Sequence, residues 1–298
     1  MKSSIDPTLK QEGTKSPLSE PSGLAVDVLG TIVNRAYDRA KRWAGANLIL
    51  QAVLFVAGVV AIFWPFVTLS YPPLAVLTAL AGADVARRAT NFKELAEEAK
   101  RLHELVAGFG NKPTGCQLAD LNHSLRNELS PEQAALLKQG ITYASSEPYG
   151  PRRALENLCE SAWFTKHLAN HCAVWVGWTF ISSLVVAISL LLWLACSHAG
   201  TGRAELGAQC IAATFTFLIS VGTVVSWVEY LKLAQKAKEV DAEADHLLAS
   251  PNPTAFEVHC LLTEYQVARA SAPLVPTWIW KLYRDSLNND WKIRTAKP

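Results

Sequence analysis

Charged residues are scarce in this sequence of 298 residues. They make up 18% of the chain, compared with about 25% in an ordinary soluble domain, whereas hydrophobic residues make up 50%. The 28 basic and 26 acidic residues leave a formal net charge of only +2, so the chain lacks the basic excess of nucleic-acid-binding proteins. This composition argues against an ordinary soluble enzyme, a disordered chain and a nucleic-acid partner, and it favours a membrane protein.

Motifs of the common catalytic classes are also missing. The sequence has neither the Gly-x-Ser-x-Gly of serine hydrolases nor the His-Glu-x-x-His of zinc peptidases. Residues 108–115 contain several glycines and a lysine, but they lack the Gly-Lys-Ser/Thr of a phosphate-binding loop. We therefore expect a protein that is not an enzyme.

Two histidines form the best candidate for a metal site. His167 and His171 are four residues apart and share one helical face, and Cys159 or Cys172 is a possible third ligand. A zinc site needs three or four converging ligands, and a haem held across a bundle needs a histidine on two spans. Since the sequence offers neither, we expect no metal and no cofactor, and we interpret the histidines as interfacial residues. The cysteines have no paired spacing and are expected to be reduced.

Long uncharged runs are what the sequence contains instead. No charged residue occurs between Arg42 and Asp84, or between Lys166 and Arg203. About 20 residues cross the apolar core of a bilayer, so the first run holds two spans. We place four transmembrane helices, at Trp43–Trp64, Phe66–Ala83, Ala173–Ala195 and Leu206–Val228. The second is short and interrupted by prolines, so a partly re-entrant path is an alternative. Two buried hairpins in a soluble protein are another, but core helices rarely run this long without a charge.

Basic residues gather on one side of these spans. Lysine and arginine cluster before the first and third spans and after the second and fourth, whereas the links inside each pair contain only Arg203. The positive-inside rule then makes both termini and the central segment cytoplasmic. Residues 1–25 are polar and lack the apolar stretch of a signal peptide, so we expect a disordered tail there.

The predicted fold is all-α, with four transmembrane helices in two hairpins. We expect a first hairpin at 26–88, a cytoplasmic helical region at 89–166, a second hairpin at 167–229, and a helical stalk and tail at 230–298. Each hairpin continues inward as a charged helix with a narrow apolar seam, whose members recur every three or four residues. These members are Phe92, Leu95, Ala99, Leu102, Val106 and Phe109 in one stalk, and Tyr230, Leu233, Ala237, Val240, Ala244 and Leu247 in the other.

The two stalk sequences align at a constant offset that matches Ala99 with Ala237. We expect the stalks to pack side by side and parallel, within one chain or between subunits. Gly108 and Gly110 should end the first stalk. Beyond the second, residues 254–257 form a capping box, which predicts a helix to about residue 270. A last helix, at about 277–291, mixes aromatic and basic residues and is expected either to cover the stalks or to rest on the membrane.

The C-terminal part of the chain resembles a known family. Glu264-Tyr-Gln-Val-Ala-Arg269, then Ala272-Pro-Leu-Val-Pro276, Trp278 and Arg284 resemble the C-terminal signature of the SMODS-associating four-transmembrane effector family. Thr277 and Trp280 stand where an acidic residue and a tyrosine would match better. The layout of two hairpins and a cytoplasmic insert is similar as well. The resemblance implies a bacterial inner-membrane effector of antiviral defence, which permeabilises the membrane when a partner cyclase supplies a cyclic nucleotide.

Two functions are therefore open. The first is an oligomeric, membrane-permeabilising effector, with the bilayer, further copies of itself and a cyclic nucleotide as partners. The alternative is a non-catalytic membrane scaffold that recruits a cytoplasmic protein through its stalks. No charged residue lies inside a span, which argues against an ion-coupled transporter.

Two sets of residues are candidates for the effector function. Guanidinium groups suit phosphate, so the candidate ligand-binding residues are Arg152, Arg153, Arg269 and Arg284; the first two also fit a plain positive-inside flank. Hydroxyl groups on one face of the fourth span are the candidate pore lining, namely Thr216, Ser220 and Thr223. Helix–helix packing through small polar residues explains that face equally well.

Overall fold

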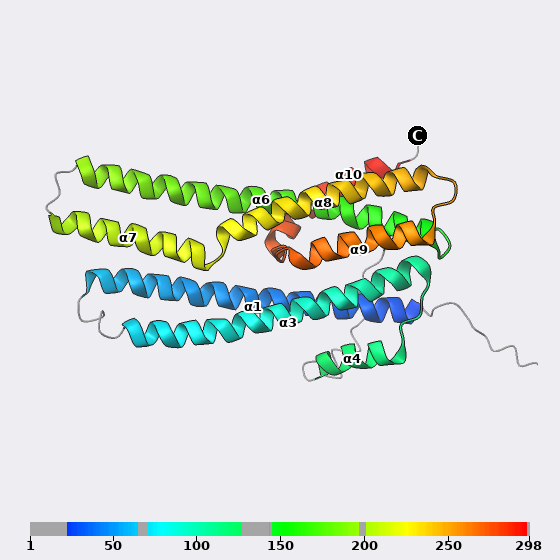
Figure 1. Cartoon of the computed structure of the whole chain (residues 1–298), viewed down its shortest axis with the longest axis horizontal. Coiled ribbons are helices and arrows are strands. Elements are labelled where there is room, and N and C mark those ends of the chain that lie inside the picture. Colours follow the sequence, from blue (N-terminus) through cyan, green and yellow to red (C-terminus); the bar gives the residue numbers. More distant parts are fainter. Residues whose placement is uncertain (1–22, 65–70, 127–142, 144, 197–200, 297–298) are drawn as a thin grey trace, which may run out of the picture.

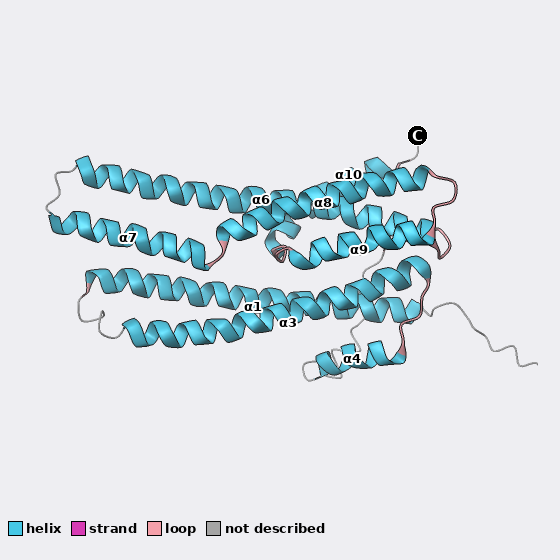
Figure 2. Ribbon diagram, viewed as in Figure 1, coloured by secondary structure: helices cyan, strands magenta, loops and turns pink. Residues whose placement is uncertain are grey.

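A computed structural model of the chain is all-α in the residues that it describes (Figures 1 and 2). These are residues 23–64, 71–126, 143, 145–196 and 201–296. Residues 1–22 of the predicted disordered tail lie outside them. In chain order the helices are α1 (Gly23–Phe63), α3 (Tyr71–Phe109), α4 (Gly115–Arg126), α6 (Pro151–Cys196), α7 (Thr201–Ser220), α8 (Thr223–Ala249), α9 (Ala255–Ser271) and α10 (Thr277–Thr295). The predicted fold class, all-α, is confirmed.

The long helices form two hairpins that lie side by side (Figure 1). In the first, α1 packs along α3; in the second, α6 packs along α7 and α8. One end of both hairpins is uncharged over long stretches and the other is charged. We call residues 43–64, 71–83, 173–196 and 201–228 the apolar half, and the remaining described residues the polar half.

Three stretches are long and apolar enough to cross a membrane. They are Leu29–Ile62, Pro151–Ser189 and Glu205–Ala249, whose most apolar parts reach a mean hydropathy of 2.2, 1.8 and 1.9. Of those parts, 0%, 22% and 11% respectively are buried inside the chain, so their large side chains, such as Val53, Trp178 and Ile219, are exposed. An apolar surface of this extent is the surface of a multi-pass membrane protein rather than of a soluble one.

The second predicted span, Phe66–Ala83, is not among these three stretches. Residues 65–70 lie outside the described part of the chain, and α3 adds only the uncharged residues 71–83 before Asp84. That is about 20 Å of helix at 1.5 Å per residue, against a bilayer core of about 30 Å. This part of α3 nevertheless runs beside α1 in the apolar half (Figure 1) and exposes similar side chains, namely Leu74, Val76, Leu77 and Leu80.

Two of the hydrophobic cores in the polar half lie in different hairpins. In one, the beginning of α1 packs against the end of α3 and α4, through Leu29, Ile32, Val33, Ala99, Leu102, Val106 and Leu121. In the other, α6, α8 and α9 meet, through residues that include Leu155, Leu158, Ala237, Val240, Val258 and Tyr265. The helical start of α1 was not predicted, although Leu29, Val33, Ala36 and Ala40 have helical spacing and are buried.

The expected packing of the two stalks on each other is wrong within the chain. Ala99 lies in the core formed with α1, whereas Ala237 lies in the core formed with α6 and α9. Helix α9 runs between the end of α3 and α8 and contacts both (Figure 1). An apolar seam shows that one face of a helix is buried, but not which helix buries it. Packing of the stalks between subunits stays a prediction.

The last helix covers the second hairpin with its aromatic residues. Trp280 and Trp291 of α10 both pack against Phe164 of α6, with ring centroids 6.2 and 6.0 Å away. The aromatic residues of α10 therefore cover α6, whereas of the expected stalk seams only Tyr230 belongs to the same core. The opposite face of α10 still exposes Leu282 and Ile293, so a contact with the membrane surface stays a prediction for that face.

The predicted helix ends are confirmed in two places. Helix α3 ends at Phe109, and Gly110 follows with φ +73°, a conformation that favours glycine. Helix α9 begins with a capping box in which Thr254 and Glu257 bond each other's backbone N–H groups. At Gly108, α3 and α6 approach closely: a Cβ there would lie 2.7 Å from the Cβ of Ala154.

We expect Gly108→Ala to destabilise the protein by about 1–3 kcal/mol, because the added methyl group overlaps a helix that cannot easily move. Thermal unfolding in detergent micelles measures the effect as a lower melting temperature. Gly115→Ala is the matched control, since a Cβ at Gly115 meets nothing within 4 Å. An unchanged melting temperature for Gly108→Ala would show that α3 and α6 do not approach this closely.

Candidate functional site

The last apolar stretch is interrupted by a break in its helix. Helix α7 ends at Ser220 and α8 begins at Thr223, and Gly222 between them has φ +70°. The Gly222 N–H donates to the Ile219 carbonyl at 2.9 Å, which closes the turn. Before this break, α7 contacts both α1 and α6; after it, α8 packs along α6 (Figure 1).

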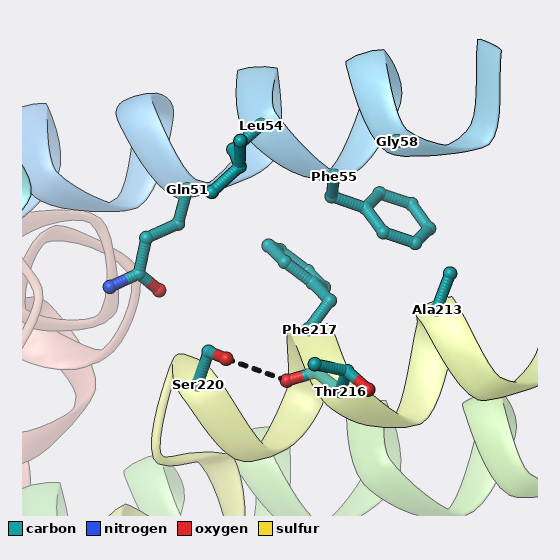
Figure 3. Close-up of a pocket in the computed structure, with 8 residues that line it drawn as sticks. All are labelled: Gln51, Leu54, Phe55, Gly58, Ala213, Thr216, Phe217 and Ser220. Carbon is teal, nitrogen blue, oxygen red and sulfur yellow. Dashed lines mark hydrogen bonds between the residues drawn. The ribbon is translucent and has the colours of Figure 1, made fainter. Parts of the chain in front are cut away.

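A cavity of about 300 Å³ lies between α1 and α7, next to the break. It is lined by Gln51, Leu54, Phe55, Gly58, Ala213, Thr216, Phe217 and Ser220 (Figure 3). Phe55 and Phe217 stack across it with ring centroids 4.8 Å apart. Gln51 extends from α1 toward the end of α7, where Ser220 lies (Figure 3). The cavity is therefore bordered both by an aromatic contact between the hairpins and by a small group of polar side chains.

The Gln51 amide lacks a partner for its oxygen. Its Oε1 is buried and accepts no hydrogen bond from the described residues, while the Ser220 hydroxyl donates to the Thr216 carbonyl at 2.7 Å. One helical turn earlier, the buried Oδ1 of Asn47 also accepts none. In hydrocarbon an unsatisfied polar group costs several kcal/mol. A water molecule or another polar group that donates to these amide oxygens would therefore stabilise the protein.

Two of the three predicted pore-lining residues lie in this cavity. Thr216 and Ser220 line it, whereas Thr223 comes after the break and is buried in the first turn of α8. Sequence reasoning assumed an unbroken helix and therefore placed all three on one face. It also missed Asn47 and Gln51, although two amides four residues apart in an otherwise apolar span are a recognisable signal.

A second polar cluster is buried in the polar half, where α9 meets α3. The Arg269 guanidinium donates to Glu104 Oε1 at 2.6 Å through Nη1, and to Glu97 Oε2 at 2.9 Å through Nε. Gln266 donates to Glu104 at 2.8 Å, and the Tyr37 hydroxyl of α1 donates to Glu97. Arg269 and Glu104 are only 7% and 6% exposed. The cluster thus ties the first hairpin to the C-terminal helices through buried, charge-assisted hydrogen bonds.

The charges in this cluster change one another's pKa. Burial is the largest influence on Glu104 and would raise its pKa, but Arg269, Lys100 and two hydrogen bonds outweigh burial and hold it below its usual value. Burial, and then the charge of Arg269, lower the pKa of Lys100 to about 8. Arg269 is therefore engaged by two carboxylates, and this weakens the expectation that its guanidinium binds a phosphate directly.

The four arginines expected to bind a ligand have different surroundings. Arg269 lies in the buried cluster, whereas Arg152 is exposed at the start of α6. The Arg153 guanidinium lies over the Tyr149 ring, 4.4 Å from its centroid. Arg284 is exposed on α10 and pairs with the next residue along the chain. The structure does not bring these four side chains into one site.

The histidines considered as metal ligands are held by aromatic rings. His171 stacks on Tyr283 with ring centroids 3.6 Å apart, and His167 contacts the edge of Trp163 at 4.6 Å. Neither belongs to the group of possible ligands around Cys159. The structure therefore does not assemble the combination of His167, His171 and Cys159.

Cys159 instead lies beside two carboxylates of α8. Its Sγ and oxygens of Asp241 and Asp245 lie within 4.8 Å of one another, close enough to hold a metal ion. However, Arg294 of α10 donates to Asp241 at 2.9 Å and to Asp245 at 2.5 Å, and Lys166 also pairs with Asp241. These cations already neutralise both carboxylates, so the geometry fits an ion-pair network that joins α6, α8 and α10.

Comparison with known proteins identifies no relative of this chain. No protein-family model matches it, and no curated protein and no solved structure shows significant similarity to it. The resemblance of residues 264–284 to an effector family therefore stays a prediction, and the site has to be interpreted from its own geometry.

We expect Arg269→Met to destabilise the protein by about 3–5 kcal/mol, because it leaves the buried Glu104 carboxylate without its cation. Arg284→Met removes an exposed pair and, as the control, should change stability by about 0.5 kcal/mol or less. Unfolding in detergent micelles measures both. Equal stability of the two variants would contradict the buried cluster.

Acid should weaken the same cluster. The pKa of Glu104 is depressed in the folded protein, so its contribution to stability is complete above its usual pKa of 4.5 and is lost as the pH falls below that value. We expect the melting temperature of the wild-type protein to fall more steeply below pH 4.5 than that of Arg269→Met. Parallel pH profiles would show that Glu104 does not titrate against Arg269.

Proposed function

We propose that this protein is an effector of a bacterial inner membrane that permeabilises the membrane when its copies assemble. The apolar half crosses the bilayer four times, and the polar half and both termini lie in the cytoplasm. The positions of the basic residues support this orientation. The exposed leucines and valines of α3 beside α1 support the fourth crossing.

The observation that carries this proposal is the cavity between the hairpins, whose mostly apolar lining includes the polar side chains of Gln51, Thr216 and Ser220. At membrane depth, polar side chains that face an interior cavity commonly line a path for water or ions. The Gln51 amide and the Ser220 hydroxyl come from different hairpins (Figure 3), and the Phe55–Phe217 stack joins the two hairpins beside them. If α7 moves away from α1, these polar groups become accessible to water and to a neighbouring copy.

The helix break allows such a movement. Helix α7 is joined to α8 through Gly222. The Gly222 N–H donates to the Ile219 carbonyl, three residues earlier, so the regular α-helical hydrogen bonding is interrupted there. Helix α7 can therefore change its contact with α1 while α8 stays packed against α6. In assembled copies, α7 would exchange its contact with α1 for one with a neighbour.

A cytoplasmic signal would act by shifting the population of closed and assembled states. The family resemblance implies that this signal is a cyclic nucleotide. The polar half is the part that must receive it, because the Arg269 cluster connects the first hairpin to the C-terminal helices there. A ligand that loosens or tightens this connection would change how the two hairpins sit together.

A scaffold function is the second candidate, and the outer face of α9 favours it. Phe256 and Val267 are 77% and 65% exposed, and Cys260 and Thr263 between them are exposed as well. Their spacing places them on one helical face. An exposed apolar face in the cytoplasmic part is suited to recruit a partner protein.

Dye release from liposomes tests the permeabilising function. We expect the full-length protein, reconstituted into dye-loaded liposomes, to release dye when cyclic oligonucleotides are added. The double variant Gln51→Leu, Ser220→Ala should slow the release by about tenfold, which corresponds to about 1.4 kcal/mol, because it removes the polar groups of the cavity. Thr179→Val is the matched control, since this exposed hydroxyl of α6 does not line the cavity.

Two results would count against this function. Liposomes that stay sealed at every ligand and protein concentration would contradict permeabilisation and favour the scaffold. Release that is equally fast in the double variant and in Thr179→Val would show that the membrane leaks by a route other than the α1–α7 cavity.

A further inference from the structure

A basic cavity of about 200 Å³ lies in the polar half, close to where the apolar half begins. Its walls come from α1, α3, α6, α8, α9 and the link between α9 and α10. Four cationic side chains line it, namely Lys41, Lys93, Lys100 and Arg269, together with a single carboxylate, Glu97. The remaining lining is mostly apolar and includes Leu168, Leu233 and Leu274.

The carboxylate that lines this cavity does not balance the four cations that line it. Glu97 is shared between Arg269 and the Tyr37 hydroxyl, and Glu104 is bonded to Arg269. Outside the lining, Asp38 acts on the charge of Lys41, and Glu94 and Glu229 act on that of Lys93. The side chains that face the cavity therefore carry a net positive charge, which favours a bound anion.

Two lysines have free hydrogen-bonding capacity toward this space. The Lys93 ammonium donates to the carbonyls of Ala270 and Ala272 at 2.6 and 2.5 Å, which fixes its position and leaves one of its three protons available. Lys100 donates no hydrogen bond to any described residue, although Glu97 and Glu104 are near enough to act on its charge. Burial, and then the charge of Arg269, lower the pKa of Lys100 to about 8, although both carboxylates favour its charged form.

We propose that this cavity binds a phosphate group through Lys41, Lys93 and Lys100. Lysine ammonium groups bind phosphate as point charges, and three of them around one small space match its charge and its several acceptor oxygens. The cavity is smaller than the 300–1,000 Å³ or so that drug-sized ligands occupy, so it accommodates a phosphate group rather than a whole cyclic oligonucleotide. Arg269 belongs to this lining as well, but phosphate binding does not depend on membrane permeabilisation.

The phosphate has two possible sources with the same chemistry. Lys41 lies two residues before Trp43, where the apolar half begins, so the headgroup of an anionic phospholipid is within reach from the membrane side. A free phosphate or phosphate ester from the cytoplasm is the other source. In either case the bound group would connect α1, α3 and the α9–α10 link and would stabilise their contact.

Thermal unfolding of the full-length protein in lipid-free detergent micelles tests the site. We expect inorganic phosphate, added at constant ionic strength, to raise the melting temperature progressively, because a ligand stabilises the state that binds it. Lys100→Gln should weaken the apparent affinity by about tenfold or more, as expected for the loss of a charge-assisted hydrogen bond. Lys238→Gln, at an exposed position of α8, is the matched control and should respond like the wild type.

The stability without phosphate separates a binding role from a structural one. Lys100 donates no hydrogen bond to the described residues, and burial disfavours its charge, so Lys100→Gln should be as stable as the wild type, or more stable, in phosphate-free micelles. If this variant is less stable there, Lys100 is a structural cation and the proposal is overturned.

Nanodiscs of defined composition identify the source. If a lipid headgroup is the ligand, nanodiscs that contain phosphatidylglycerol should abolish the response to added phosphate, and phosphatidylcholine nanodiscs should preserve it. If the ligand is a free phosphate, both nanodiscs should preserve the response. The proposal is overturned if phosphate stabilises the protein in no preparation, or if Lys100→Gln and Lys238→Gln respond equally.

Discussion

Along α1 the surroundings of the side chains change within a few residues. Up to Ala40 its apolar side chains are buried against α3, and beyond Trp43 they are exposed in several directions. The same change occurs in α6 near residue 173. In hydrocarbon every backbone N–H and carbonyl must be paired within its own helix. A continuous helix keeps these groups paired on both sides of the boundary between lipid and water. The division into an apolar and a polar half follows from this constraint.

The two halves are held together by different forces. In the polar half, apolar seams are removed from water, and the buried Arg269 cluster determines which helices meet. In the apolar half, lipid offers no such driving force, so packing depends on close contact and on the few polar groups present. There the hairpins meet through the Phe55–Phe217 stack and an unsatisfied amide, which is a weak contact. We therefore place the functional movement at the α1–α7 contact.

The sequence predicted those features that depend on local chemistry. Uncharged runs indicated the long apolar helices, and Gly110 and the pair Thr254 and Glu257 indicated helix ends that the structure contains. Features that depend on distant residues were not predictable. Nothing in the sequence around Arg269 shows that Glu97 and Glu104 lie beside it, or that α9 separates the two stalks. Gln51 does not interrupt an uncharged run, and nothing in the sequence shows that α7 lies opposite it.

Substituted-cysteine labelling tests the central claim, that the chain crosses the membrane four times with its polar half inside. Single cysteines replace Trp64, Glu98, Glu205 and Ser250, one at a time, in a cysteine-free background. Bacterial spheroplasts that contain each variant are then treated with a membrane-impermeant maleimide. The account predicts labelling at Trp64 and Glu205 in intact spheroplasts, and at Glu98 and Ser250 only after permeabilisation. Labelling of Glu98 from outside would show that α3 does not cross, and labelling of Ser250 from outside would contradict the orientation of the polar half.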